Sequence, residues 1–238
     1  MKVLIFDIWG DFGHFKKFYT TSSPLTFSFP PPPTIKGMLG AILGLDKREY
    51  LNIMADDRCK LGIGLVNPVK KVRMGLNHIN TKGNFWTLVK KKNHEARTQI
   101  RTEFLKNPHY RIYFHHEDEE LFNQLIQNVK EHKTFYTLSL GLSELLADFK
   151  FISVMEFKEA ENSRIEVKSV IPIYSIKEGG VFVTEGKRYF KERIPIKMNQ
   201  NREVEIYDDV IFEADGKPVE IFAKRFWEGE NGECITFF

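Results

Sequence analysis

The chain has 238 residues, of which 42% are hydrophobic and 28% are charged, so it can bury one large core or two modest ones and lies far from the composition of disordered proteins. It contains no apolar run of the ~20 residues that would span a bilayer and no signal peptide at its start, which predicts a cytoplasmic protein without a membrane partner. The two cysteines lie far apart in the chain, which excludes a four-cysteine zinc site and argues against a disulfide framework.

The first element in chain order is a strand. Residues 1–10, MKVLIFDIWG, are mostly apolar and end in glycine, which is typical of a central strand. A loop of about twenty residues follows, and loops of that length are usually functional or disordered. Six aromatic side chains favour packing over disorder in this loop: Phe12, Phe15, Phe18, Tyr19, Phe27 and Phe29.

Residues 10–20 of this loop have the composition of a binding segment. Gly10 and Gly13 allow a ligand to approach the backbone closely, and Phe15 and Phe18 alternate with basic residues. Such a segment suits a single strand of RNA. The pattern fits equally well with aromatic side chains in the core and lysines in water, so both interpretations stand.

A helix is predicted over residues 34–44, with Thr34 as the N-cap. Apolar residues recur at the helical spacing at Ile35, Met38, Leu39, Ile42 and Leu43. Lys36 lies in the first turn, where a cation is unfavourable to the helix dipole, so we interpret it as a contact to an RNA phosphate beside free backbone N–H groups. Small residues form a shallow strip for a partner subunit or an RNA backbone: Gly37, Gly40, Ala41 and Gly44.

A strand is predicted over residues 59–74, with a break at Asn67-Pro68, and a strongly basic segment follows. Residues 70–106 contain ten Lys or Arg against Glu95 and Glu103, a charge of +8, so the rest of the chain has 25 cations against 30 acids, or −5. Because Lys and Arg release counterions from phosphates, this segment predicts nucleic-acid binding. The alternative is a solvated loop whose charge keeps the protein soluble.

The elements predicted over residues 109–159 complete the order of strands and helices in the first part of the chain. A strand over 109–116 precedes a helix over 117–133, whose acidic start and basic end match the helix dipole, and a strand over 149–159 follows. Strand, helix, strand, basic insertion, strand, helix and strand predict an α+β, ferredoxin-like (RRM-like) domain over residues 1–158. The basic insertion, or thumb, is expected at about 75–105, and we predict that it is partly disordered without RNA.

Residues 159–238 change to short strands with turn signals, which predict a small antiparallel β domain. Asp215-Gly216 and Asn231-Gly232 are flanked by apolar strands and are predicted to be two-residue hairpin turns.

The sequence contains no group of residues with the specific spacing of a known catalytic site. Residues 115–120, HHEDEE, resemble a metal cluster, but adjacent histidines on a strand point to opposite faces and the acids are explained by the helix start. Metal-free RNA cleavage needs a base, an acid and a cation, for which the available groups are His14, Tyr19, Lys36, Tyr50, His115 and His116. The sequence does not show that any three converge, so no catalytic residue, metal site or cofactor is predicted.

Residues 9–44, WGDFGHFKKFYTTSSPLTFSFPPPPTIKGMLGAILG, resemble the N-terminal signature of CRISPR-associated protein family five, of the RAMP superfamily. A glycine strand end, a small-x-Phe-basic loop, TTSSPLTF, a PP-x-T lead-in and the GMLGAILG helix occur in the family's order. The likeness is greatest to the type I-B branch of Cascade subunits. SLGLSELL at 139–146 and KRYFKERIPIKM at 187–198 are weaker matches.

The resemblance implies a ferredoxin-like domain with an inserted basic thumb and a C-terminal β portion. It also implies a non-catalytic subunit that caps the 5′ handle of the crRNA, contacts the large and backbone subunits of Cascade, and so helps to position target DNA. One branch of the family instead cuts repeat RNA without metal, which is the alternative. The candidate RNA-binding residues are His14, Phe15, Lys16, Lys17, Thr34, Lys36, Gly37, Arg73, Lys90, Lys91, Lys92, Arg97, Arg101, Lys187 and Arg188.

Overall fold

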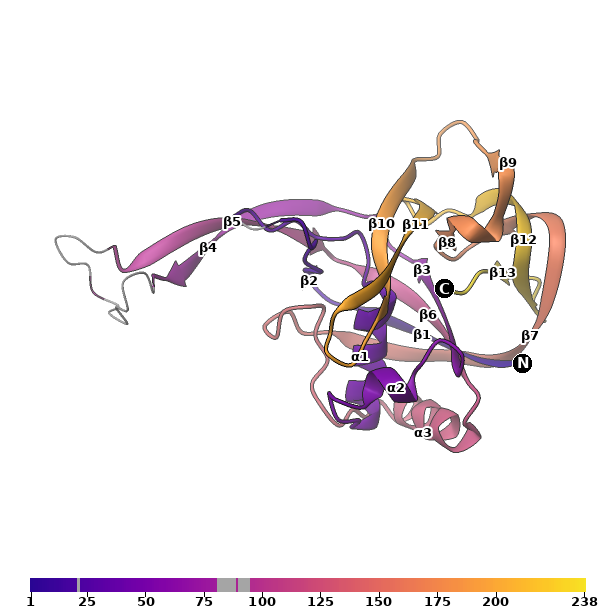
Figure 1. Ribbon diagram of the computed structural model, residues 1–238, viewed down its shortest axis with the longest axis horizontal. Helices are drawn as coiled ribbons and strands as arrows, with labels where there is room; N and C mark the ends of the chain where they lie inside the picture. Colours follow the sequence, from indigo (N-terminus) through magenta and orange to yellow (C-terminus); the bar gives the residue numbers. More distant parts are fainter. Residues whose placement is uncertain (21, 81–88, 90–94) are drawn as a thin grey trace.

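The structure is a computed structural model that describes residues 1–20, 22–80, 89 and 95–238. It confirms a mixed α+β fold that is mostly sheet (Figure 1). A seven-stranded sheet has the order β3-β6-β1-β7-β13-β12-β9, and two three-stranded sheets have the orders β10-β11-β8 and β2-β5-β4. Among the described residues, no helix is long and apolar enough to cross a membrane.

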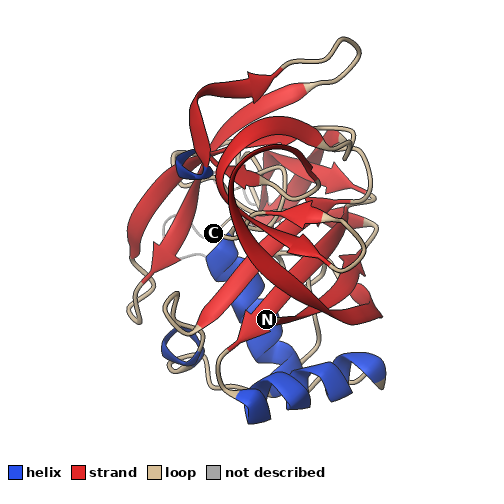
Figure 2. Cartoon of the chain, turned by 90° about the vertical axis from the view of Figure 1, so that its right-hand side faces the viewer, coloured by secondary structure: helices blue, strands red, loops and turns tan. Residues whose placement is uncertain are grey.

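The first half of the large sheet contains the elements predicted from the sequence. Its strands are β1 (Lys2–Trp9), β3 (Cys59–Leu65), β6 (His109–His116) and β7 (Asp148–Val167), and every neighbouring pair among them is antiparallel. The helices are α1 (Pro32–Leu43), the short α2 (Tyr50–Ile53) and α3 (Glu119–Lys130). Figure 2 shows α1 and α3 together on one side of the strands.

The strand β1 is apolar along most of its length because both of its faces are covered. Leu4, Phe6 and Ile8 pack into the core that contains α1 and α3. Val3 and Ile5 face the other way, into a smaller cluster with side chains from the C-terminal end of the chain: Trp227, Ile235 and Phe237. The expected central strand is therefore confirmed, and the C-terminal residues supply the cover for its second face.

The helix α1 begins two residues earlier than the sequence predicts. Its N-cap is Pro31, with no side-chain cap, and Thr34 lies in the first turn, where its N–H donates to the Pro31 carbonyl at 2.9 Å. Proline fixes φ near the helical value and lacks the N–H that a first turn leaves unpaired, so the prolines themselves start the helix. Thr34 as the N-cap was therefore wrong. The helix ends at Gly44, whose φ of 76° is left-handed.

The basic segment forms a hairpin that projects from the rest of the molecule (Figure 1). Its strands β4 (Lys71–Ile79) and β5 (Arg97–Lys106) pair over their whole length, and β2 (Phe12–Gly13) adds to β5. The predicted break at Asn67-Pro68 is confirmed, since β3 ends at Leu65 and β4 begins at Lys71. The prediction that the thumb is partly disordered without RNA stays a prediction, since 81–88 and 90–94 of its residues 75–105 lie outside the described residues.

The two halves of the large sheet are joined by β7, which pairs with β1 in the first half and with β12 in the second. The strand β7 has 20 residues, so residue 158, where the sequence predicts a boundary, lies inside it. Beyond it, β12 (Val219–Gly229) pairs with β7, β9 (Ile176–Phe182) and β13 (Cys234–Ile235). The remaining elements are β8 (Ile171–Pro172), a 3-10 helix (Ile173–Ser175), β10 (Tyr189–Met198) and β11 (Val204–Glu213).

The two predicted hairpin turns have different outcomes. Asn231-Gly232 lies between β12 and its antiparallel partner β13, which confirms a hairpin there, but residues 230–233 separate the strands, so the turn is longer than the predicted two residues. Asp215-Gly216 does not connect paired strands: β11 pairs with β10 and β8, whereas β12 belongs to the large sheet. That hairpin prediction was wrong, because the turn instead carries the chain from one sheet to the next. Gly216 is required there, since its φ is 78° and a Cβ would lie 2.5 Å from the Leu65 carbonyl oxygen.

Candidate nucleic-acid interface

The β4–β5 hairpin has one face that is strongly basic. Residues directly opposite each other in an antiparallel pair share a face, and the register places Gly75 opposite Arg101 and Ile79 opposite Arg97. Arg73 lies on the same face as Gly75, two residues away on β4. A cavity of about 570 Å³ on this face is lined by Arg73, Gly75, Gln99 and Arg101, and the Gln99 side chain lies over Gly75.

The opposite face of the hairpin is apolar. Its β4 positions are Val72, Met74 and Leu76, and Ile100 and Phe104 lie across from Leu76 and Val72 on β5. Val72, Met74 and Leu76 are half-buried, and Phe104 is buried. This alternation separates the charge onto one surface and therefore presents three arginines on one side of the projecting hairpin.

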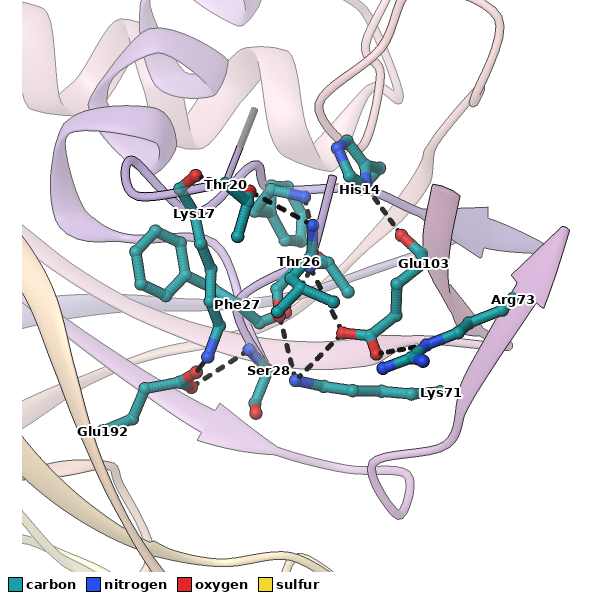
Figure 3. Close-up of polar contacts among 12 residues, drawn as sticks. His14, Lys17, Thr20, Thr26, Phe27, Ser28, Lys71, Arg73, Glu103 and Glu192 are labelled. Carbon is teal, nitrogen blue, oxygen red and sulfur yellow. Dashed lines mark hydrogen bonds and ion pairs between the residues drawn. The ribbon is translucent and has the colours of Figure 1, made fainter. Parts of the chain in front are cut away.

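At the base of the hairpin, Glu103 ties it to the N-terminal loop (Figure 3). Its carboxylate accepts from the Thr26 N–H at 3.3 Å and lies 3.5 Å from Arg73 Nε and 3.8 Å from Lys71 Nζ. Lys71 Nζ also donates to the Thr26 carbonyl at 2.9 Å. Burial lowers the pKa of Lys71, while the charges of Glu192 and Glu103 oppose that shift.

A second carboxylate ties the same loop to β10. Glu192 forms an ion pair with Lys17 and accepts a hydrogen bond from the Ser28 N–H at 3.1 Å (Figure 3). Burial lowers the pKa of Lys17, but the hydrogen bond and charge of Glu192 outweigh it and hold this pKa above its usual value. The loop is therefore held between the hairpin and β10 by Glu103 and Glu192.

These contacts surround a cavity of about 520 Å³, which we call the β10 cavity. Five cations and one carboxylate line it together with an apolar wall, and the lining residues are Lys17, Tyr19, Ser28, Val69, Lys71, Arg188, Phe190, Lys191, Glu192, Arg193, Phe212 and Ala214. With a charge of this sign and an exposed aromatic ring, the β10 cavity and the basic hairpin face form one candidate interface for a polyanion.

The structure brings only some of the predicted residues to this interface. Lys17 and Arg188 line the β10 cavity, and Arg73, Arg97 and Arg101 lie on the hairpin face. Lys16 is exposed in the loop, while Lys187 is half-buried and donates to the Pro218 carbonyl at 2.7 Å. The predicted Lys90, Lys91 and Lys92 lie outside the described residues.

Three candidates are buried, so their side chains do not offer an open surface. Phe15 packs against Tyr110 in the core, and His14 Nδ1 lies 2.7 Å from the Glu103 carbonyl. For these two, the interpretation that the loop's aromatic rings pack inward is the correct one, because the loop folds across the sheet. Lys36 is also buried and pairs with Asp56, and this partner accounts for a cation in the first turn without any phosphate.

Thr34 and Gly37 lie on α1, half-buried and away from the residues that line the β10 cavity. A Cβ at Gly37 would lie 3.7 Å from the Tyr50 hydroxyl oxygen, and one at Gly40 would lie 3.2 Å from the Tyr50 Cβ. A smaller hollow of about 440 Å³ lies over this strip, and Tyr136 and Arg202 also line it. The close approach that the small residues allow is therefore partly used by α2 itself.

Sequence reasoning missed Lys71, Phe190, Lys191, Glu192 and Arg193. The signal was present in KRYFKERIPIKM, where four of the seven residues at 187–193 are basic and two are aromatic. Its importance depends on β10 lying beside the N-terminal loop, which the periodicity of either segment does not reveal.

The groups considered for metal-free RNA cleavage have separate environments, and all six belong to the described residues. His116 is buried with Nε2 2.9 Å from the Ile53 carbonyl, whereas His115 Nδ1 lies 2.8 Å from the Lys2 carbonyl. Tyr19 lines the β10 cavity and Tyr50 covers the α1 glycines. Their contacts do not join a tyrosine, a lysine and a histidine in one open site.

The described residues contain no group of three or more His, Cys, Asp or Glu side chains arranged to hold a metal ion. The two histidines at 115 and 116 have different partners, as expected for adjacent strand residues. Both cysteines are free thiols; Cys59 is buried, and this burial raises its pKa to about 11.

Comparisons with known proteins agree with this architecture. The family model described as CRISPR-associated protein (Cas_Cas5) matches residues 3–208. No curated protein matches the chain. A crystal structure of a CRISPR protein from Archaeoglobus fulgidus is similar, with a TM-score of 0.59 and 14% identity over 98% of this chain and 97% of that one. A chain of a CRISPR RNA-guided surveillance complex has a TM-score of 0.56 and 8% identity over 98% and 93%. At these identities, the likeness is one of fold.

Proposed function

The chain belongs to the CRISPR-associated protein (Cas_Cas5) family, and on this premise we propose that it is a non-catalytic, guide-RNA-binding subunit of a type I Cascade-like antiviral complex. It caps the 5′ handle of the crRNA, contacts the large and backbone subunits, and acts on target DNA indirectly, in the cytoplasm. This function requires a surface that follows a phosphate backbone without reacting with it.

The observation that carries the proposal is the separation of charge on the β4–β5 hairpin. Three arginines lie on one face, two of them lining the cavity at Gly75, and the other face is mainly apolar. Arg97 and Arg101 are exposed and have no ion pair within the described residues, so their charges are available to phosphates. A projecting, two-stranded element with one cationic face can lie along a single strand of RNA.

In this proposal, residues 1–158 are a ferredoxin-like domain, β4 and β5 are the strands of its thumb, and 159–238 are a second β domain. The strand order β3-β6-β1-β7, antiparallel throughout, with α1 between β1 and β3 and α3 between β6 and β7, supports the first assignment. The position of the hairpin between β3 and β6 supports the second. The two domains share β7.

The test is the salt dependence of guide-RNA binding. Arg97→Gln with Arg101→Gln removes two phosphate contacts, so the slope of log K against log salt should fall in magnitude by about 1.4, at about 0.7 for each contact to a single strand. Lys158→Gln is the matched control, because Lys158 is an exposed cation on β7, far from the hairpin in sequence and in sheet. An unchanged slope in the double variant would refute the proposal.

The same preparation addresses the enzymatic alternative. The wild-type protein is incubated with its cognate repeat RNA in EDTA, and the products are resolved by length and end group. We expect intact RNA. Cleavage at one position, leaving a 5′-hydroxyl end, would replace the binding function with that of a metal-independent endoribonuclease.

A further inference from the structure

The β10 cavity has the features of a site for a single nucleotide, in addition to the general cationic surface of the hairpin. We propose that it holds one unstacked nucleotide of the guide strand, with the base against Phe190 and the adjoining phosphate beside Lys71. This inference rests on the proposed guide-RNA binding and assigns a position on the protein to one base of that strand.

The aromatic wall is rigid and has a free face. Phe190 is 51% exposed, and its ring stacks on Phe212 with centroids 5.9 Å apart and an interplanar angle of 19°. Phe212 is buried and makes an edge contact with Phe29, 5.2 Å away. One face of Phe190 is thus supported from behind, and the exposed fraction leaves the other face for a planar ligand. Val69 and Ala214 extend the apolar lining.

The charges around this wall favour a phosphate. Four of the five cations have carboxylate partners, since Lys17 pairs with Glu192, Arg188 with Asp215 and Lys191 with Asp209, and Lys71 forms a longer contact with Glu103. The Lys71 side chain is 28% exposed, its contact with Glu103 is long at 3.8 Å, and burial removes part of its hydration, so a phosphate would add a closer partner for its charge.

Glu192, the acid of the cavity, does not repel a phosphate as a free carboxylate would. Its two oxygens are engaged by Lys17 Nζ and the Ser28 N–H (Figure 3). The cavity volume of about 520 Å³ lies in the range of sites for small organic ligands, which suits a base with its sugar and phosphate.

Continuity with the hairpin favours a nucleotide within a strand over a free one. Lys71 and Arg73 are two residues apart on β4, so their side chains lie on the same face. A strand that follows the basic face toward the base of the hairpin therefore reaches Lys71 and the mouth of the β10 cavity. A nucleotide within the guide strand and a free nucleotide both present a base beside a phosphate, and competition with a free nucleotide distinguishes them.

The test combines protein variants with abasic substitutions in the guide RNA. Phe190→Ala should weaken binding of the cognate guide RNA about 5- to 150-fold, because one base–aromatic stack is lost, without changing the salt slope. Phe190→Leu keeps apolar contact with Phe212 but should weaken binding similarly, since it lacks a π face. Lys71→Gln should instead reduce the salt slope by about 0.7. Phe135→Ala is the control, because Phe135 is an exposed ring outside the β10 cavity.

An abasic scan of the 5′ handle identifies the nucleotide. One abasic position should weaken binding to the wild type as much as Phe190→Ala does, and the two losses should not add, because both remove the same stack. Melting temperatures of the variants check that each one folds.

The outcomes separate this inference from the function on which it rests. Wild-type affinity in both Phe190 variants, with a salt slope that still depends on Arg97 and Arg101, would overturn the inference and leave guide-RNA binding intact. Binding of adenosine 5′-monophosphate to the wild type but not to Phe190→Ala, with no displacement of the guide RNA at millimolar concentration, would also overturn it, by making the cavity a site for free nucleotides. If the wild type binds no guide RNA, both proposals fail.

Discussion

The ion pair between Lys17 and Glu192 should contribute more to stability than any exposed pair on the same strand. The side chains are only 14% and 10% exposed, and Glu192 also accepts the Ser28 N–H. Glu192→Gln would leave the Lys17 ammonium largely out of water without a counter-charge. Removing one member of a fully buried pair costs about 3–5 kcal/mol and of an exposed pair at most about 1 kcal/mol. We expect an intermediate loss of about 1–3 kcal/mol.

A protein of this size should then melt lower by about 2–12 °C, at about 2–4 °C for each kcal/mol. The matched control is the pair of Lys191 on β10 and Asp209 on β11, whose N–O distance is 2.8 Å but whose side chains are 60% and 29% exposed. Asp209→Asn should change the free energy of unfolding by no more than about 1 kcal/mol. Because the pKa of Lys17 lies above its usual 10.5, its contribution should persist below pH 10.5 and be lost as the pH rises further.

A double-mutant cycle with Lys17→Met and Glu192→Gln, followed by urea unfolding, measures the coupling directly. The reasoning is refuted if the coupling between Lys17 and Glu192 is no larger than the coupling between Lys191 and Asp209. A coupling of the expected size would mean that the N-terminal loop is anchored to β10 before any RNA binds.

Three further predictions concern other parts of the chain. Gly141→Ala should destabilise the protein by about 2–4 kcal/mol in urea, because φ is +103° and a Cβ would lie 1.9 Å from the His14 carbonyl oxygen; wild-type stability would contradict this. Asp118 accepts from the Leu121 and Glu120 N–H groups, which lower its pKa below the usual 3.8, so any stability advantage over Asp118→Asn should shrink as the pH falls through that range in acid titrations. Iodoacetamide at pH 8 should label Cys234 and spare Cys59, whose pKa is raised to about 11 by burial; two labels on the native protein by mass spectrometry would be inconsistent with this.

Much of the fold could be predicted because several elements carry their signals locally. The strand β6 alternates over HYRIYFHH, and α3 has an acidic first turn and a basic residue near its end. The start of α1 was harder, because a threonine beside prolines satisfies the N-cap rule while the prolines begin the helix themselves. The turn at Asp215-Gly216 has hairpin chemistry, but which strands it connects depends on pairing with distant segments.

The candidate interface was predictable to the extent that it depends on local charge. The exposed Arg73, Arg97 and Arg101 were found from the density of basic residues in one segment. His14 and Lys36 were chosen on residue type, yet burial in each case comes with a partner inside the protein: Glu103 for His14 and Asp56 for Lys36. Residue type indicates what a side chain can bind, whereas burial determines whether that capacity is used internally.

The sequence by itself determined the order of the main elements, the basic segment and the family signature, because periodicity, composition and motif spacing are properties of neighbouring residues. Only the tertiary structure decided that Lys17, Lys71 and Phe190 line one cavity. These residues are separated by long stretches of chain, and they meet because the loop is held to β10 by Glu192 and to the hairpin by Glu103. Contacts of this kind depend on strand pairing and on satisfying buried polar groups, and neither is encoded in the spacing of residues along a single element.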